Sequence, residues 1–192
     1  MTAHEHTVAT MDGRQLRRIR NIEAVREAIL ELMVERANLT LERVADRAGV
    51  TVRSIYRYHA DLEEAIADAS ACRLALIYET WDRWQRPDLD LPLDERIELV
   101  LDHRIEMEAL GRPLRNTIQA TNPDLRFDAE VTDAFAPELD AVPDADRPSV
   151  VASVCFLFRP RCIRSVMEIP QHDGHDGRTL LHFMIRRALG VD

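Results

Sequence analysis

Four polar side chains in the stretch Val52–Tyr58 have the types and spacing of a surface that contacts nucleic acid. They are Arg53, Ser54, Tyr56 and Arg57. Their neighbour Ile55 is the clear inward residue of a short helix, so these four are left for the opposite face. Arginine can hold a guanine base through two parallel hydrogen bonds, and Arg53 is the best candidate for such a contact.

The residues before this helix predict the element that positions it. An apolar stripe at helical spacing is formed by Leu41, Val44, Ala45 and Ala48. Gly49 can adopt the left-handed conformation that ends a helix, and Thr51 is a good N-cap for the next one. Two short helices joined in this way are the plan of a helix-turn-helix, whose second helix lies in the major groove of DNA.

This stretch resembles the DNA-binding domain of TetR-family transcriptional regulators. The family pattern is a capped helix, then A-x-x-A-G-V, a Ser or Thr, and a short helix that ends in Leu or Ile, Tyr and further aromatic residues. The matching residues are Ala45, Ala48, Gly49, Val50, Thr51, Ile55, Tyr56 and Tyr58, followed by Asp61, Glu63 and Glu64. The resemblance is specific over about residues 15–70. Beyond that region only length and helical pattern agree.

The resemblance implies roles for the polar positions. Tyr56 would bond a backbone phosphate, and Thr40 would contact phosphate from the start of the preceding helix. Val52 is either core or touches a thymine methyl group. The expected DNA-binding residues are Arg18, Thr40, Thr51, Val52, Arg53, Ser54, Tyr56 and Arg57.

Upstream of the helix-turn-helix, the sequence predicts a disordered leader, an arginine-rich arm and a bracing helix. Residues 1–13 are polar and aperiodic. The arm that follows contains Arg14, Arg17, Arg18 and Arg20. We expect it to approach phosphates or the minor groove; the alternative is a solvated leader that touches nothing. The bracing helix is expected over residues 21–36, with Asn38 in the left-handed conformation after it.

Two residues depart from the family pattern. His59 stands where the family places a buried Phe, so we expect it to be partly exposed or hydrogen-bonded locally. Leu62 stands where a Lys or Arg reaches phosphate, which predicts weaker or less salt-dependent DNA binding. Asp61 and Glu64 form a capping box, so a helix begins here regardless.

The charge of the chain is divided unevenly. Residues 1–60 contain ten arginines and eight acidic residues, a balance of +2, whereas residues 61–192 contain fifteen arginines and 26 acidic residues, a balance of −11. The chain has no lysine. The positive balance coincides with the segment that resembles a DNA-binding domain, as contact with phosphates requires.

Several classes of protein are disfavoured by what the sequence lacks. It has no apolar signal segment and no run of about twenty apolar residues that would span a membrane. Three widely spaced cysteines (Cys72, Cys155 and Cys162) lack metal or disulfide spacing, so we expect reduced, buried thiols in a cytoplasmic protein. A composition of 46% hydrophobic and 31% charged residues is ordinary for a soluble protein of one or two domains.

No catalytic fingerprint is present, so we expect neither an enzyme nor a cofactor. The rival signal is the segment His172–Asp176, whose His and Asp side chains could bind a divalent metal. It lies in a glycine-containing loop that is not pre-organised, and we therefore expect no metal site.

The remainder of the chain predicts an all-α fold. Helices are expected over residues 62–84, 93–110, 128–139, 149–169 (kinked at Pro160) and 179–189, with a short helix between Pro113 and Pro123 and a loop from Gln171 to Gly177. The expected domains are a three-helix helix-turn-helix domain at 14–60 and a helical ligand-binding and dimerisation domain at 61–192. By resemblance, the last two long helices pair with those of a second subunit; the alternative is that they fold inward on a monomer.

A pocket for a small-molecule effector would lie among the helices between Leu62 and Met167. Candidate lining residues are Trp81, Trp84, His103, Met107, Arg115, Asn116, Phe135, Phe156 and Arg159, although each can also be plain core or surface. The sequence therefore predicts a homodimeric regulator, a repressor, that binds a palindromic operator and is released by a small molecule. The alternatives are a DNA-binding regulator without an effector and a helical ligand-binding protein whose DNA-binding domain has decayed.

Overall fold

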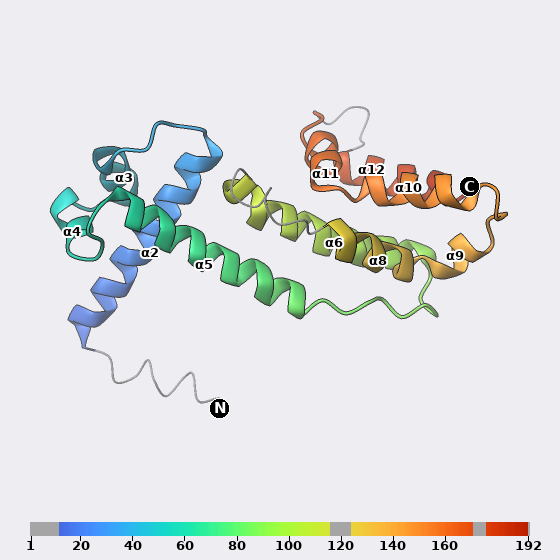
Figure 1. Ribbon diagram of the computed structural model, residues 1–192, viewed down its shortest axis with the longest axis horizontal. Coiled ribbons are helices and arrows are strands. Elements are labelled where there is room, and N and C mark those ends of the chain that lie inside the picture. Colours follow the sequence, from blue (N-terminus) through green and yellow to red (C-terminus); the bar gives the residue numbers. More distant parts are fainter. Residues whose placement is uncertain (1–11, 116–123, 171–175, 192) are drawn as a thin grey trace. The chain divides into compact units, whose positions relative to one another are not determined.

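The computed structural model describes residues 12–115, 124–170 and 176–191 (Figure 1). Every regular element in these ranges is a helix, which confirms the all-α prediction. The elements are α2 (Gly13–Val34), α3 (Leu41–Ala48), α4 (Val52–Tyr56), α5 (Leu62–Asp82), α6 (Leu93–Gly111), the 3₁₀ turn η1 (Arg112–Leu114), α8 (Asp124–Ala134), α9 (Ala136–Asp140), α10 (Arg147–Leu157), α11 (Pro160–Met167) and α12 (Gly177–Ala188). Within the described ranges, no helix combines the length and the apolar character needed to cross a bilayer.

The described residues divide into two compact units. The first comprises those up to Leu76 together with Arg112–Arg115, and the second comprises Ile77–Gly111 and the described residues from Asp124 onward. The division falls inside α5. The separate assignment of residues 14–60 and 61–192 to DNA binding and ligand binding concerns function and stays a prediction.

The first unit is built on α2, which is longer than expected. Asp12 caps its start by accepting a hydrogen bond from the backbone N–H of Arg14 at 3.4 Å. The residues predicted to form an extended arm, among them Arg18, therefore lie in the first turns of the helix. In these turns Leu16 is half-buried and the arginines are exposed.

The end of α2 differs from the prediction at one residue. Arg36, and not Asn38, takes the left-handed conformation, with φ of 53°. The amide of Arg36 bonds to the carbonyl of Met33 at 3.2 Å, and that of Ala37 bonds to the carbonyl of Leu32 at 3.0 Å. These two bonds form a Schellman motif, in which the residue just past the helix end must be left-handed, whatever its type.

The remaining core of the first unit follows the predicted apolar stripes. Its buried apolar side chains are Val25, Ala28, Ile29, Leu30 and Leu32 of α2, Val44 and Ala45 of α3, Ile55 of α4, Ala65 and Ala69 of α5, and Leu114 of η1. The expected start of α5 is confirmed, because Asp61 accepts from the amide of Glu64 at 2.8 Å. Glu64 accepts from the amide of Ala60 in return.

The second unit has one apolar core shared by six helices. The core is lined by large side chains such as Ile97, Leu101, Phe135, Phe158, Ile163 and Leu181. Helix α6 packs against α8, α11 and α12, while α10 packs against α8, α9 and α12. Arg96 lies in this core and bonds to the carbonyl of Ala134 at 2.8 Å and to the carboxylate of Glu138.

Two helices predicted as continuous are each broken in two. The segment expected at 128–139 forms α8 and α9, which meet at Phe135, a fully buried side chain. The segment expected at 149–169 forms α10 and α11. Arg159 is extended, with φ of −64° and ψ of 140°, because the residue before Pro160 is sterically excluded from the helical region. Pro160 thus starts a new helix rather than kinking the old one.

Two surface helices of the second unit are joined by a ladder of charges. Three acidic residues of α6 face three residues of α12, and both sets have a four-residue spacing. The acidic residues are Asp94, Glu98 and Asp102, and their partners on α12 are Arg178, His182 and Arg186. His182 is central, with its Nε2 atom 3.5 Å from Asp94 and 3.7 Å from Glu98.

Candidate nucleic-acid interface

Short-range contacts fix the geometry of α3, α4 and the turn between them. Thr40 caps α3 by accepting from the amide of Arg43 at 3.3 Å, and Thr51 caps α4 by accepting from the amide of Ser54 at 3.1 Å. Gly49 is left-handed, with φ of 64°, and the amide of Val50 bonds to the carbonyl of Ala45 at 3.0 Å. These observations confirm the predicted helix ends, which depend only on residues within a few positions of one another.

Helix α4 buries one side chain and exposes most of the others. Ile55 is fully buried, whereas the side chains of Arg53 and Arg57 are exposed and Tyr56 is 55% exposed. Val52 is half-buried, as is Ser54, whose hydroxyl lies 2.9 Å from that of Thr51. The helix thus presents the polar face that the sequence predicts.

Two groups of arginines in the first unit differ in their partners; Arg36, Arg43, Arg112 and Arg115 belong to neither group. Arg26, Arg47 and Arg73 bond to carboxylates; Arg47, for example, bonds to both Glu31 and Glu35. A second group pairs with no carboxylate among the described residues. It consists of Arg14, Arg17, Arg18 and Arg20 on α2, and Arg53 and Arg57 at α4, all of them exposed.

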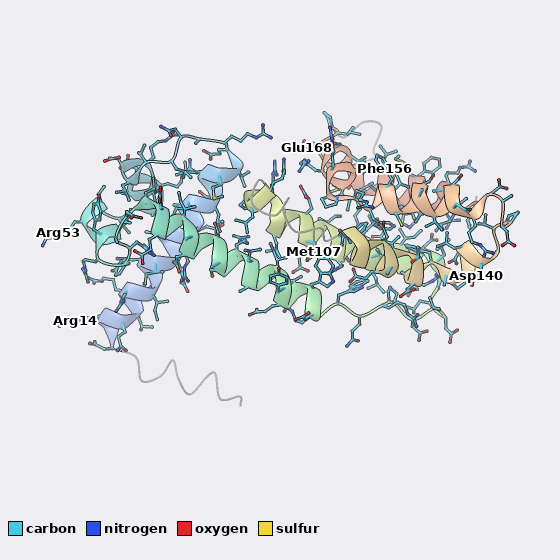
Figure 2. The ribbon with its side chains drawn as sticks, in the orientation of Figure 1. Arg14, Arg53, Met107, Asp140, Phe156 and Glu168 are labelled. Atoms are coloured by element: carbon cyan, nitrogen blue, oxygen red, sulfur yellow. The ribbon has the colours of Figure 1, made fainter. Side chains whose placement is uncertain are left out.

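Arg18 and Arg57 of the second group lie beside the same ring, that of Tyr58, and Figure 2 labels Arg14 at the start of α2 and Arg53 on α4. Their own segments offer no carboxylate: residues 13–22 and 47–60 contain no acidic residue, and the acidic residues of α2 begin at Glu23. We call this set of six exposed arginines, none of which pairs with a carboxylate among the described residues, the basic end.

Tyr58 contacts arginines of both parts of the basic end, α2 and the end of α4. It was not among the DNA-binding residues expected from the sequence. The guanidinium carbon of Arg57 lies 5.6 Å from the centre of its ring, and that of Arg18 lies 5.8 Å away. Both distances are within the range of cation–π contacts. Because Arg18 is forty positions earlier in the chain, no local pattern could reveal this contact.

The environment of His59 contradicts both outcomes expected for it. The residue is buried, with 7% exposure, and its Nε2 atom has no hydrogen-bond partner. The Nε2 atom lies 3.9 Å from the carboxylate of Asp68. That carboxylate accepts hydrogen bonds of 2.7 and 2.8 Å from the guanidinium group of Arg26. These bonds lower the pKa of Asp68 and keep it ionised. Leu62, the other departure, is half-buried at the start of α5.

The residues predicted to bind an effector have different surroundings, and their role stays a prediction. Trp84 stacks on His103, with ring centres 4.3 Å apart, and Trp81 donates to Glu130 at 2.6 Å. Met107 is half-buried and Phe135 is buried. Arg115 belongs to the first unit, and Asn116 lies outside the described residues.

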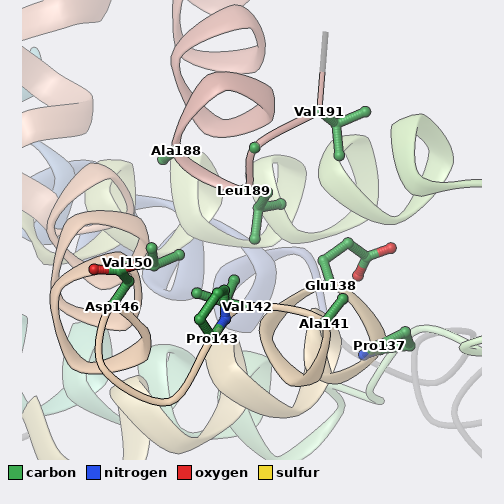
Figure 3. A pocket seen from close by; sticks show the side chains of 11 residues that line it. Pro137, Glu138, Ala141, Val142, Pro143, Asp146, Val150, Ala188, Leu189 and Val191 are labelled. Carbon is green, nitrogen blue, oxygen red and sulfur yellow. The ribbon is translucent and has the colours of Figure 1, made fainter.

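Phe156 and Arg159 line a separate pocket of about 380 Å³ on α10. Arg159 bonds to Asp128 at 2.9 Å within it, and Phe156 is 64% exposed. A larger pocket of about 590 Å³ lies between the 137–150 region and the end of α12 (Figure 3). Leu189 and Val142 are among its lining residues, and none of the predicted effector-binding residues is.

The three thiols differ in exposure, and most of the suggested metal loop lies outside the described residues. Cys155 and Cys162 are buried as expected, but Cys72 is exposed, because it lies on an outer face of α5. Burial raises the pKa of Cys155 to about 11, so this thiol stays protonated. Residues 172–175 of the loop lie outside the described residues, and Asp176 caps α12 by accepting from the amide of Thr179 at 2.8 Å. Within the described ranges, no group of three or more His, Cys, Asp or Glu residues is placed to hold a metal ion.

Comparison with known proteins adds no relative. No protein-family model, no curated protein and no solved structure matches this chain.

Proposed function

We propose that the first unit is a helix-turn-helix DNA-binding domain of the TetR type, and that the protein is a transcriptional regulator. The observation that carries the proposal is the basic end, whose six exposed arginines on the first half of α2 and at α4 pair with no carboxylate among the described residues. An exposed set of uncompensated guanidinium groups is suited to a polyanion. A short helix in the middle of that set is suited to a DNA groove.

The side chains of α4 divide between positioning and specificity. Arg53 is exposed and unpaired within the described part of the chain, so both edges of its guanidinium group are free to grip a guanine. Tyr56 and Thr40 bond to backbone phosphates. Thr40 uses its hydroxyl oxygen as a helix cap, which leaves its proton free to donate to a phosphate oxygen.

The regulator acts as a homodimer, because a palindromic operator presents two half-sites and each needs a recognition helix. Support for an interface at the last helices comes from exposed aromatic side chains on two of them. Phe156 of α10 is 64% exposed and Phe183 of α12 is 55% exposed. A small molecule that binds the second unit would favour a conformation of the dimer in which the spacing of the two recognition helices no longer fits the operator. The protein is then a repressor that the small molecule releases from DNA.

The test is a fluorescence-anisotropy titration against the DNA upstream of the protein's own gene, at two salt concentrations. We expect tight, salt-sensitive binding that exceeds binding to a scrambled sequence. Arg53→Ala should lose about 1–3 kcal/mol of operator preference. Arg36→Ala is the matched control, because Arg36 is an exposed arginine of the same unit that lies outside the basic end.

Each alternative gives a different result in this assay. Equal affinity for operator and scrambled DNA at both salt concentrations would contradict specific regulation at that site and favour a ligand-binding protein with a decayed DNA-binding domain. Specific binding that no small molecule reverses would favour a regulator without an effector.

A further inference from the structure

Tyr58 occupies a rigid position immediately after α4. The carbonyl of Ile55 accepts hydrogen bonds from the amides of Tyr58 at 2.9 Å and His59 at 3.0 Å. Ile55 and His59 are both buried, so the turn is anchored on either side of Tyr58. The half-buried ring therefore has a fixed place on the surface of the first unit.

Two guanidinium groups lie against this ring from different parts of the chain. Arg57 comes from the same turn, and Arg18 comes from α2. Neither has a carboxylate partner among the described residues, and no acidic residue occurs at 13–22 or 47–60. The aromatic ring is thus the group that orients both cations.

An aromatic ring orients a cation differently from a carboxylate. Arg47 is held by Glu31 and Glu35, and its charge is cancelled by them. A ring attracts a guanidinium group through its quadrupole and leaves both the net charge and the in-plane N–H donors available. Arg18 and Arg57 are therefore held in place while they keep the charge and the donors that a phosphate requires.

We propose that Tyr58 is a positioning residue that holds Arg18 and Arg57 as a pair of phosphate-binding groups beside α4. Their ligand is the phosphodiester backbone of duplex DNA, and the inference rests on the proposed function. Tyr58 itself makes no base contact in this arrangement. By holding Arg18 and Arg57 in place beforehand, Tyr58 reduces the conformational entropy that these side chains lose when they bind phosphates.

The test compares Tyr58→Leu with Tyr58→Phe in the anisotropy assay. Tyr58→Leu should weaken binding to operator and scrambled DNA alike, by about 3- to 10-fold, and should reduce the slope of log affinity against log salt by about one. Tyr58→Phe keeps the ring and should stay within about 2-fold of the original protein. Tyr78→Leu, which removes an exposed tyrosine of the second unit, should change nothing.

A double-variant cycle adds a readout that a general loss of structure would not give. If Tyr58 acts through Arg18, the effects of Tyr58→Leu and Arg18→Ala on affinity should be less than multiplicative. Multiplicative effects, normal binding by Tyr58→Leu, or failure of Tyr58→Phe to retain affinity would each overturn the inference.

Arginine side-chain NMR separates this inference from the DNA-binding proposal. The Nε–Hε resonances of Arg18 and Arg57 should both move in Tyr58→Leu, because the ring current is lost, while that of Arg53 should stay in place. If neither resonance moves in Tyr58→Leu while the unaltered protein binds DNA normally, the pairing of Arg18 and Arg57 by Tyr58 is refuted and the DNA-binding proposal stands. Absence of any DNA binding by the unaltered protein would refute the DNA-binding proposal and, with it, the phosphate role of the pair.

Discussion

Gly177 shows how strongly one residue can be specified by a distant part of the chain. It is buried at the first position of α12, although the sequence predicted a loop there. A Cβ atom at this position would lie 2.6 Å from the Cα of Met167 and 2.9 Å from the carbonyl carbon of Val166. Both neighbours are backbone at the end of α11, so no side-chain rotation could relieve the clash. Glycine lets α11 and α12 approach closely.

We expect Gly177→Ala to lower the free energy of unfolding by about 1–3 kcal/mol, because the added methyl group forces the two backbones apart. The measurement is chemical denaturation followed by circular dichroism. Gly111→Ala is the control: a Cβ there meets no atom within 4 Å, and alanine in a helix should leave stability unchanged or raise it by up to about 1 kcal/mol. Equal stability of the two variants would contradict the close approach.

His103 is a second residue whose environment dominates its chemistry. It is 7% exposed, its Nε2 atom has no hydrogen-bond partner, and it stacks on Trp84. Burial, together with the charge of Arg104, lowers its pKa from 6.5 to about 4. The folded protein thus binds a proton at His103 less readily than the unfolded chain does. The resulting stability is fully present above pH 6.5 and is lost as pH falls toward 4.

We expect His103→Phe to remove this dependence while keeping a ring against Trp84. Between pH 6.5 and 4, the free energy of unfolding of the variant should fall by about 2–3 kcal/mol less than that of the original protein. Denaturation curves at several pH values and constant ionic strength would measure the difference. Parallel pH profiles for the two proteins would show that His103 is protonated equally well in the folded state.

At the scale of elements, helix boundaries with a clear local cap were predicted more accurately than the others. The caps at Thr51 and Asp61 were predicted correctly, because a cap bonds to amides two or three residues away. The end of α2 was placed two residues too late, since its Schellman bonds form after Val34, and Arg36 must then take the left-handed conformation.

The strained end of α2 leads to a stability prediction. A non-glycine residue in the left-handed region costs about 1 kcal/mol, and glycine avoids that cost. We therefore expect Arg36→Gly to raise the free energy of unfolding by about 0.5–1 kcal/mol, measured by thermal or chemical denaturation. Arg36→Ala is the control and should give no gain, because alanine has the same steric conflict. A gain in both variants would point to the arginine charge instead of the backbone.

For the whole molecule, the charge division and the exposed aromatic residues are the informative features. Residues 61–192 carry a balance of −11, so a polyanion is repelled by most of the chain and attracted at the basic end. Phe156 and Phe183 are large apolar side chains left exposed on the second unit, and burial against a second copy would remove them from water.

We expect the protein to sediment as a dimer at micromolar concentration and Phe156→Asp with Phe183→Asp to sediment as a monomer, because two carboxylates cannot be buried in an apolar interface. Tyr78→Asp is the control, as Tyr78 is equally exposed on α5, away from the last helices. The monomeric variant should also lose preference for a two-half-site operator. A monomeric original protein would remove the dimer from the proposal.

The amino-acid sequence by itself determined the all-helical class, the starts of α3, α4 and α5, the Gly49 turn, and which face of α4 is polar. These features depend on residues within about four positions of one another, where spacing along the chain is also spacing in space. Only the tertiary structure decided which arginines are neutralised, that Arg18 and Arg57 share the ring of Tyr58, and that Gly177 touches the backbone of α11. Contacts of this kind depend on how helices pack, and helical spacing alone does not specify that packing.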